Sequence, residues 1–195
     1  HGLDASFPLA GAWRGGVSLR YFGFPDYNEQ LAAFTASGML GRGLSAGVQP
    51  VFARVGIADG VSEYGSATAV SLNFGLRAEV YGRWVFAASI RNPLEVRLGE
   101  SDERLERRMD IGAAYMPAAG MESRFSVSRD FRGLRLHAGQ AVPVGPVSLM
   151  AGVQTDPVSL SGGFGATVGG VSFEYALQTH PDLAPTHQAG AAYAF

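Results

Sequence analysis

The sequence predicts an all-β fold, from a continuing alternation of apolar and polar residues, regularly spaced turns and a low content of charge. Of the 195 residues, 47% are hydrophobic and only 16% are charged, where about 25% is usual for soluble domains. No apolar run reaches the roughly 18 to 20 residues of a spanning helix. Strands that alternate between a lipid-facing and a lumen-facing side have this composition. We therefore expect a transmembrane antiparallel up-and-down β-barrel.

The last stretch of the chain shows the alternation most clearly. Because successive side chains of a strand point to opposite faces, the segments on either side of the connection 179–186 each have one apolar face. That face carries Val171, Phe173, Tyr175, Leu177, Ala189, Ala191, Tyr193 and Phe195. A final aromatic in register with an apolar face resembles the end of bacterial outer-membrane barrels, where it belongs to the assembly signal. We expect Phe173, Tyr175, Tyr193 and Phe195 to face lipid and to serve assembly.

Turn signals divide the chain into about thirteen strands. The strands expected in the first half are Ala5–Trp13, Val17–Phe24, Glu29–Met39, Leu44–Gly56, Ala67–Tyr81 and Trp84–Asn92. Their connections are expected at Arg14-Gly15-Gly16, Pro25–Asn28, Leu40–Gly43, Gly60–Ser66 and Tyr81-Gly82-Arg83. The alternation is weakest between residues 29 and 56.

The longest and most charged connection is Pro93–Arg107, which we expect to be a solvated loop. The strands expected after it are Arg108–Met116, Met121–Asp130, Gly133–Val142, Val147–Gln154, Val158–Val168 and the final pair. No stretch keeps a helical period over about a dozen residues. We therefore expect residues 1–195 to form a single outer-membrane barrel domain.

The number of strands raises a question about the start of the chain. A closed bacterial barrel normally has an even number of strands and both termini in the periplasm. About thirteen visible strands therefore lead us to expect a missing N-terminal segment and fourteen strands in the intact protein. A miscounted strand between residues 29 and 56 would instead leave twelve.

Periodicity alone does not decide between a soluble β-sandwich and a membrane barrel. Aromatics such as Trp13, Trp84 and Tyr115 fall near strand ends, where membrane barrels have interfacial girdles. The faces opposite the apolar ones carry small residues mixed with ionic ones, which suit a narrow polar lumen. The ionic residues expected to face the lumen are Arg20, Arg77, Glu79, Arg91, Asp110, Arg124, Arg135 and Glu174. These features favour the barrel.

The chemistry that the sequence offers is limited. The chain has no Cys, and its net charge of −2 gives no reason to expect a nucleic-acid partner. His137, with Ser126 and Ser128 nearby in sequence, lacks a nucleophile motif, and we interpret it as a hydrogen-bonded lumen residue. The His180, Asp182 and His187 set could bind a metal, but the surrounding prolines favour a stiff loop. We expect no catalytic, cofactor or metal site.

Two segments have recognisable motifs. The first is Arg91-Asn92-Pro93 followed by Asp110-Ile-Gly-Ala-Ala-Tyr-Met-Pro117; the second is the closing hairpin from Tyr175 to His187. Both resemble the PorV/PorQ-like outer-membrane proteins, which are similar to FadL-type barrels. In that hairpin Ala184 and Gln188 replace a Gly and an Arg that are common in the family. The resemblance implies a fourteen-stranded barrel that serves type IX secretion in Gram-negative bacteria.

Two classes of function follow from this resemblance. The first is a non-enzymatic secretion or surface-attachment component of the bacterial outer membrane, with a translocon or a cargo protein as partner and membrane lipid around it. The second is a FadL-like channel for hydrophobic small molecules, and a structural subunit of another envelope complex remains a third possibility. The ionic lumen set looks polar and cross-braced, so the sequence favours the first class.

Overall fold

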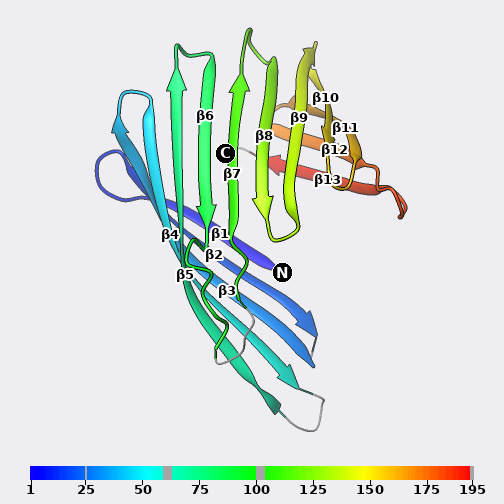
Figure 1. Cartoon of the computed structure of the whole chain (residues 1–195). Helices are drawn as coiled ribbons and strands as arrows, with labels where there is room; N and C mark the ends of the chain where they lie inside the picture. The colour runs from blue at the N-terminus through cyan, green and yellow to red at the C-terminus, as the bar shows by residue number, and fades with distance from the viewer. Residues whose placement is uncertain (25, 59–62, 100–103, 194–195) are drawn as a thin grey trace. The chain divides into compact units, whose positions relative to one another are not determined.

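The computed structural model describes all residues except 25, 59–62, 100–103 and 194–195. The described residues form 13 antiparallel strands in one sheet, whose order follows the chain from β1 to β13 (Figure 1). No helix in this part of the chain is long and apolar enough to span a membrane. The strands are β1 Gly2–Pro8, β2 Trp13–Phe24, β3 Tyr27–Gly41, β4 Leu44–Ala58, β5 Glu63–Val80, β6 Trp84–Arg91, β7 Arg108–Tyr115, β8 Glu122–Asp130, β9 Gly133–Val144, β10 Val147–Gln154, β11 Ser159–Val168, β12 Val171–Gln178 and β13 Thr186–Tyr193. The predicted all-β, up-and-down arrangement is confirmed.

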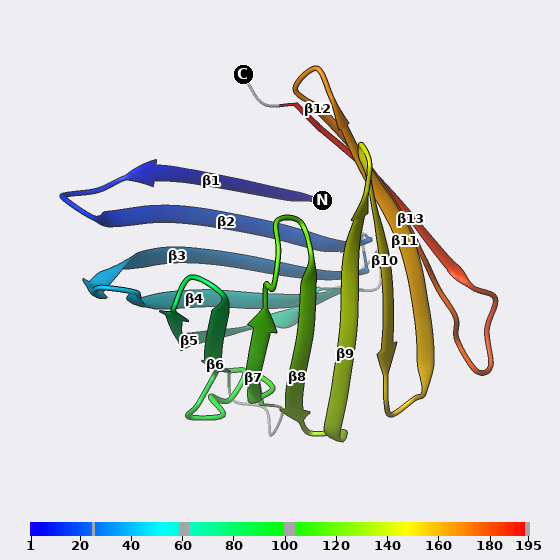
Figure 2. The same cartoon turned by 90° about the horizontal axis from the view of Figure 1, so that it is seen from above.

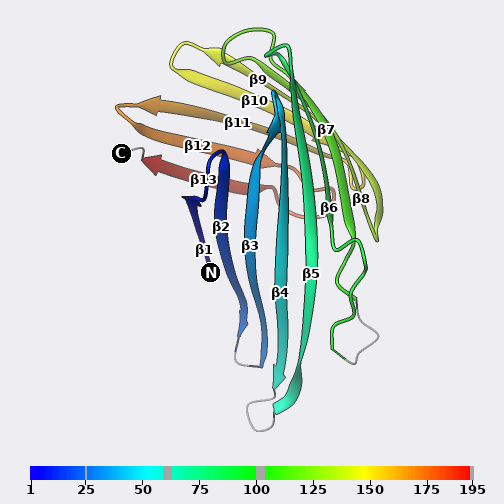
Figure 3. The same ribbon diagram turned by 90° about the vertical axis from the view of Figure 1, so that its left-hand side faces the viewer.

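The chain divides into two compact units. Unit 1 comprises His1–Ala78 and Ala87–Met109, and unit 2 comprises Glu79–Phe86 and Asp110–Phe195. In unit 1, β1 to β5 lie side by side as long antiparallel strands (Figures 2 and 3). In unit 2, β8 to β13 form a second series of antiparallel pairs.

The weakly alternating region between residues 29 and 56 does form two strands, β3 and β4. Their register is continuous over Tyr27–Ala33, which pair with Ile57–Val51. On the other side β4 pairs with β5 along nearly its whole length. A strand held by two neighbours needs little intrinsic preference of its own, because cross-strand packing supplies the stability. The count of thirteen is therefore confirmed over the described residues, and the twelve-strand alternative is wrong.

The first hairpin differs from the prediction. The expected Arg14-Gly15-Gly16 turn lies inside β2, and the chain reverses instead at Leu9–Ala12, where Gly11 has φ +60°. Gly15 is opposite Phe7 in the register, and the Phe7 ring occupies the space that a Cβ at position 15 would need. Gly15 is thus a packing position under an aromatic ring rather than a turn residue.

The connection Pro93–Arg107, predicted to be a solvated loop, is exposed or half-buried over its described residues except for Leu98, which is buried. Leu98 is 7% exposed, and the Gly99 amide donates a hydrogen bond to the Thr68 carbonyl over 2.9 Å. A bridge joins Arg97 to Arg104, and the Leu105 amide donates to the Val96 carbonyl. The described part of this connection therefore packs against β5.

In a soluble protein the large apolar side chains are buried, whereas in this chain most of them are exposed. Among the described residues, the buried apolar side chains are few and all belong to unit 1: Ala33, Val51, Ala53, Ala69 and Leu98. Large apolar side chains on the other face stay exposed, for example Val70 at 65% and Phe125 at 61%. A soluble domain keeps contiguous exposed apolar area small. This distribution fits strands whose apolar face borders lipid.

Candidate functional site

The register of unit 1 places its side chains on two faces. One, here called the ionic face, carries Arg20 from β2 and Arg77 from β5. It also carries every second residue of β3 and β4, namely those whose side chains point to the same side as Arg20 and Arg77 in the register. The other, here called the apolar face, carries the exposed aromatic and aliphatic side chains. In unit 2 the ionic face is the one that carries Asp110, Arg124, Arg135 and Glu174, and the apolar face is the one that carries Phe125 and Phe173.

A chain of uncharged polar side chains crosses the ionic face of unit 1. Gln49 Nε2 donates to Thr35 Oγ1 over 2.8 Å, and Asn73 Nδ2 donates to Gln49 Oε1 over 2.9 Å. Asn73 Oδ1 in turn accepts the backbone amide of Asn92 over 3.0 Å. Three strands and the start of the long connection are thereby joined in one row. Each amide uses both its donor and its acceptor, which orients the side chain and holds it rigidly.

Asn92 is the residue that fastens the connection to this row. It is 4% exposed, and its Oδ1 accepts hydrogen bonds from Ser71 Oγ at 2.9 Å and from the Val96 amide at 3.1 Å. Its Nδ2 donates to the Leu105 carbonyl. Asn92 also has φ 45°, a left-handed conformation that Asn adopts more readily than most residues. Side-chain chemistry and backbone conformation both suit Asn here.

A patch of apolar residues lies beside the amide row on the same face. Val51 pairs with both Ala33 and Ser71, and Ala53 pairs with both Leu31 and Ala69. Leu98 is the buried apolar residue of the connection that packs on β5. The ionic face of unit 1 is therefore apolar over part of its length, a feature that the sequence analysis did not anticipate.

Four of the residues that define the ionic faces have partners on the same or the adjacent strand. Arg20 pairs with Asp4 at 2.8 Å, Arg124 with Glu122 at 2.6 Å, and Arg135 with Asp130. Asp110 accepts a hydrogen bond from Ser128 at 2.8 Å. Arg77, Glu79 and Arg91 each also interact with another group. Glu174 pairs in the register with Gly165 and Gly190, which leaves it room on both sides.

Ser128 brings the His137 side chain into a polar cluster, but not in the arrangement of a catalytic triad. Ser128 Oγ donates to Asp110 Oδ1 and lies 3.3 Å from His137 Nε2. Ser128 Oγ thus lies between the carboxylate of Asp110 and the His137 ring. A triad needs His between the nucleophile and the acid. The cluster fits the expected hydrogen-bonded His, and Ser128 rather than Ser126 is its partner.

His180, Asp182 and His187, which the sequence analysis considered as metal ligands and set aside, make separate contacts. His187 Nδ1 is 2.6 Å from Tyr175 Oη, whereas His180 Nδ1 accepts the Asp182 amide over 3.2 Å. Over the described residues no group of three His, Cys, Asp or Glu side chains could hold a metal ion.

The residues predicted to face lipid lie together on the apolar face of unit 2. Phe173 pairs with Ala191, Tyr175 with Ala189, and Val171 with Tyr193. Phe173 is 55% and Tyr193 65% exposed. Phe195 lies outside the described residues. At the strand ends of the same unit Trp84 stacks on Tyr115 with the ring centroids 4.4 Å apart, as expected of an interfacial aromatic.

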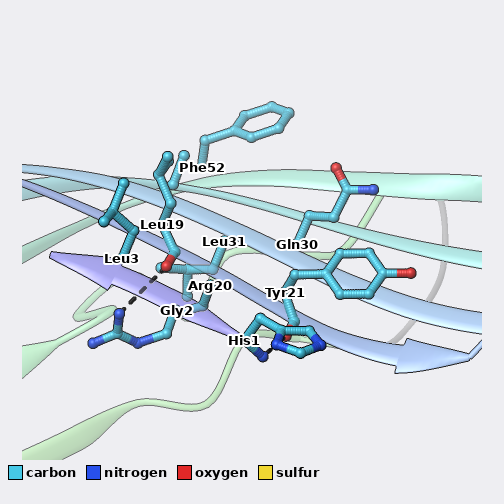
Figure 4. Close-up of a pocket in the computed structure, with 10 residues that line it drawn as sticks. His1, Gly2, Leu3, Leu19, Arg20, Tyr21, Gln30, Leu31 and Phe52 are labelled. Atoms are coloured by element: carbon cyan, nitrogen blue, oxygen red, sulfur yellow. Dashed lines mark hydrogen bonds between the residues drawn. The ribbon is translucent and has the colours of Figure 1, made fainter.

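A shallow groove of about 490 Å³ lies on unit 1 where β1 begins (Figure 4). Its walls include Leu3, Leu19, Tyr21 and Phe52, and the amino group of His1 donates to the Tyr21 carbonyl over 2.8 Å. The lining is mostly apolar, with His1, Arg20 and Gln30 at its polar part.

Comparisons with known proteins identify the fold. No family model and no curated protein matches the sequence. The structure is similar to the toluene transporter TbuX of Ralstonia pickettii, with a TM-score of 0.65, 11% sequence identity, and coverage of 96% of this chain and 78% of the transporter. It is also similar to a mutant Rh. blastica porin, with a TM-score of 0.54, 8% identity, and coverage of 100% of this chain and 89% of the porin.

The fold is that of an outer-membrane β-barrel. The exposed apolar faces agree with the contact with membrane lipid that the sequence predicts. The amide row and Asn92 are the candidate functional residues that sequence reasoning missed. The only signal for them was the Asn92-Pro93 pair at the end of a strand, since alternation shows which face a residue occupies but not what packs on it.

Proposed function

We propose that this chain forms the membrane-spanning part of an outer-membrane channel or transporter for small hydrophobic molecules. The sequence favoured a secretion component and kept this function as the alternative. The observation that carries the proposal is the apolar patch on the ionic face of unit 1, where Ala33, Val51, Ala53 and Ala69 are between 5% and 8% exposed. Similarity in fold to a toluene transporter supports the same choice.

The sequence analysis disfavoured a channel for hydrophobic molecules because the lumen was expected to be ionic and braced by ion pairs across it. The ion pairs in the structure weaken that argument. The Glu122–Arg124 pair lies within one strand, and the Asp4–Arg20 and Asp130–Arg135 pairs join adjacent strands. These three pairs brace the sheet locally rather than across a lumen. Their charges are neutralised in place, which leaves neighbouring apolar residues free to line a path.

The test is a flux measurement on the full chain reconstituted in phospholipid vesicles. Entry of a small aromatic hydrocarbon is compared with entry of a sugar of similar size, with empty vesicles as reference. We expect the protein to accelerate the hydrocarbon more than the sugar. Ala53→Asp places a carboxylate in the apolar patch and should reduce hydrocarbon flux about tenfold, whereas Ser45→Asp places one on the same face of β4, in the row of Arg77, and should change it little.

Folding must be separated from transport in this comparison. Heat-modifiable mobility in a detergent gel shows whether each variant is folded, and Ala53→Ser offers a milder change at the same position. Faster entry of the sugar than of the hydrocarbon, or equal hydrocarbon flux through folded Ala53→Asp and folded Ser45→Asp, would contradict the proposal.

A secretion or attachment role of the PorV/PorQ type is a second candidate, favoured by exposed apolar side chains in the connections of unit 2. Phe131 is 74%, Val158 68% and Leu183 69% exposed, and all three lie at or beside connections on one end of their strands. Exposed apolar side chains of this kind suit contact with a protein partner. Crosslinking from position 183 in intact cells, followed by identification of the crosslinked protein, tests this role, and the absence of any protein adduct there would count against it.

A further inference from the structure

The apolar face of unit 2 contains a second groove, separate from the ionic face discussed above. It has a volume of about 480 Å³ and crosses β7 to β10. Its lining includes Ile111, Ala113, Phe125, Leu136, Ala138 and Val153. The small side chains Ala113 and Ala138 lie between the larger ones, so the sheet surface is hollowed there. A hollow of this kind on a lipid-exposed face accommodates an extended hydrocarbon chain.

Arg129 lies on the same face, just beyond this groove. Val127, a groove residue, pairs with Leu136, and Arg129 pairs with Leu134 in the next row. Two residues along a strand span roughly 7 Å, so the guanidinium can reach the end of the groove. Arg129 is exposed, and no described carboxylate pairs with it. A charge directed toward lipid is costly unless it lies near the interface and meets an anion.

The turn that follows β8 adds a second cation. Arg132 is exposed and stacks over the Phe131 ring at 5.2 Å from its centroid. The intervening Asp130 accepts the Arg132 backbone amide over 2.9 Å and forms an ion pair with Arg135, so its charge is balanced by Arg135. The nearby acidic group is Asp156, whose carboxylate lies beside Gly133. Apart from the Asp130–Arg135 pair, the charged side chains in the described part of this region include Arg129, Arg132 and Asp156.

The lengths of the connections between strands indicate in which leaflet the β8–β9 turn lies. The β8–β9 turn lies at the same end of its strands as the β12–β13 connection, residues 179–185, because the strands alternate in direction. At the opposite end are the tight turns Gly145-Pro146 and Gly169-Gly170. Outer-membrane barrels have short periplasmic turns and longer extracellular loops. Arg129 and Arg132 therefore belong to the outer leaflet.

We propose that this groove and its two arginines bind a phosphorylated, acylated lipid of the outer leaflet. One acyl chain occupies the hollow between β7 and β10, and the guanidinium groups of Arg129 and Arg132 bind the phosphate, an anion that suits the planar arginine fork. The inference rests on the membrane location assumed in the proposed function.

The test measures lipid retained by the full-length protein, purified in detergent and mixed with diphosphorylated lipid A. Native mass spectrometry counts the bound lipid. We expect Arg129→Gln combined with Arg132→Gln to lower retention at least tenfold. Arg83→Gln removes an exposed arginine from the turn at the opposite end of the strands and should leave retention unchanged. Ala138→Leu fills the floor of the groove and should lower retention while both arginines remain.

Further measurements show whether the protein recognises the lipid phosphate, and whether free phosphate can occupy the same site. Dephosphorylated lipid A should bind at least tenfold more weakly to the unaltered protein, and millimolar inorganic phosphate should not displace the lipid. Equal retention by the double variant, or equal binding of the dephosphorylated lipid, would overturn the inference, and so would displacement by free phosphate. Hydrocarbon flux in vesicles without lipid A is measured independently. If the protein accelerates hydrocarbon flux but retains no lipid A, only the lipid site is refuted. If it retains lipid A but does not accelerate hydrocarbon flux, only the transport function is refuted.

Discussion

Ser71 on β5 donates a hydrogen bond of 2.9 Å to the side-chain oxygen of Asn92, the first residue after β6. Both residues are buried, at 6% and 4% exposure. This bond joins the β4–β5 part of the sheet to the long connection and sets the amide row and the apolar patch side by side. The connection is thus part of the ionic face, and the following predictions begin with it.

Replacing Asn92 should release the connection. Asn92→Ala removes the acceptor for Ser71 and Val96 and the donor to Leu105, and leaving buried groups unsatisfied costs about 1–3 kcal/mol. We expect limited proteolysis between residues 93 and 99 to become at least tenfold faster in the folded protein. Asn92→Gly is the control, because glycine tolerates φ 45° without strain. Both variants should be cleaved quickly if the side chain holds the connection; protection of the glycine variant would mean that backbone conformation does so.

A charge on the apolar face of β12 should impair assembly more than a charge loss on the ionic face. Phe173 and Glu174 are adjacent in sequence but belong to opposite faces. An Arg at the bilayer midplane costs about 2–4 kcal/mol, so Phe173→Arg should greatly lower the yield of folded, heat-modifiable protein in the membrane. Glu174→Gln should leave that yield nearly unchanged. Equal yields would show that the faces are assigned wrongly.

The Asp130–Arg135 ion pair should matter more to stability than the Asp4–Arg20 pair. The side chains of the first pair are only 4% and 19% exposed, whereas those of the second are 63% and 49% exposed. Removing one partner of a buried pair costs about 3 kcal/mol because the other charge is left unpaired. Asp130→Asn should therefore shift the urea unfolding midpoint markedly downward, while Asp4→Asn, in a solvent-screened pair, should shift it little. Similar midpoints for both variants would contradict the assigned burial.

A side chain at position 38 should displace the Trp13 indole. Gly38 pairs with Trp13, and a Cβ there would lie 2.5 Å from the Trp13 ring. Gly38→Val should therefore change the tryptophan fluorescence and near-ultraviolet circular dichroism of the folded protein and reduce its stability. Gly190→Ala is the matched control, since nothing lies within 4 Å of the corresponding Cβ. An unchanged Trp13 environment in Gly38→Val would refute this packing.

Local sequence patterns were sufficient for the fold class and for most strands. Alternation assigned Phe173 and Glu174 to opposite faces, and turn residues such as Gly43 and Gly145, both with positive φ, marked the reversals. Such patterns are readable because a strand's two-residue period and a turn's backbone requirements involve only neighbours in sequence. The same local evidence misplaced the first turn, since Gly15 resembles a turn residue unless the position of Phe7 is known.

Only the tertiary structure decided what covers each face. The burial of Leu98 in a connection that packs against β5, the bonds of Asn92, and the groove beside Arg129 depend on residues far apart in the chain. Composition made the ionic faces look uniformly polar, because alternation counts residue types and cannot show that Ala33, Val51 and Ala69 adjoin across three strands. Register between strands creates that patch. The sequence alone therefore determined that these are membrane-type strands, and the pairing between strands determined where the apolar patch and the grooves lie.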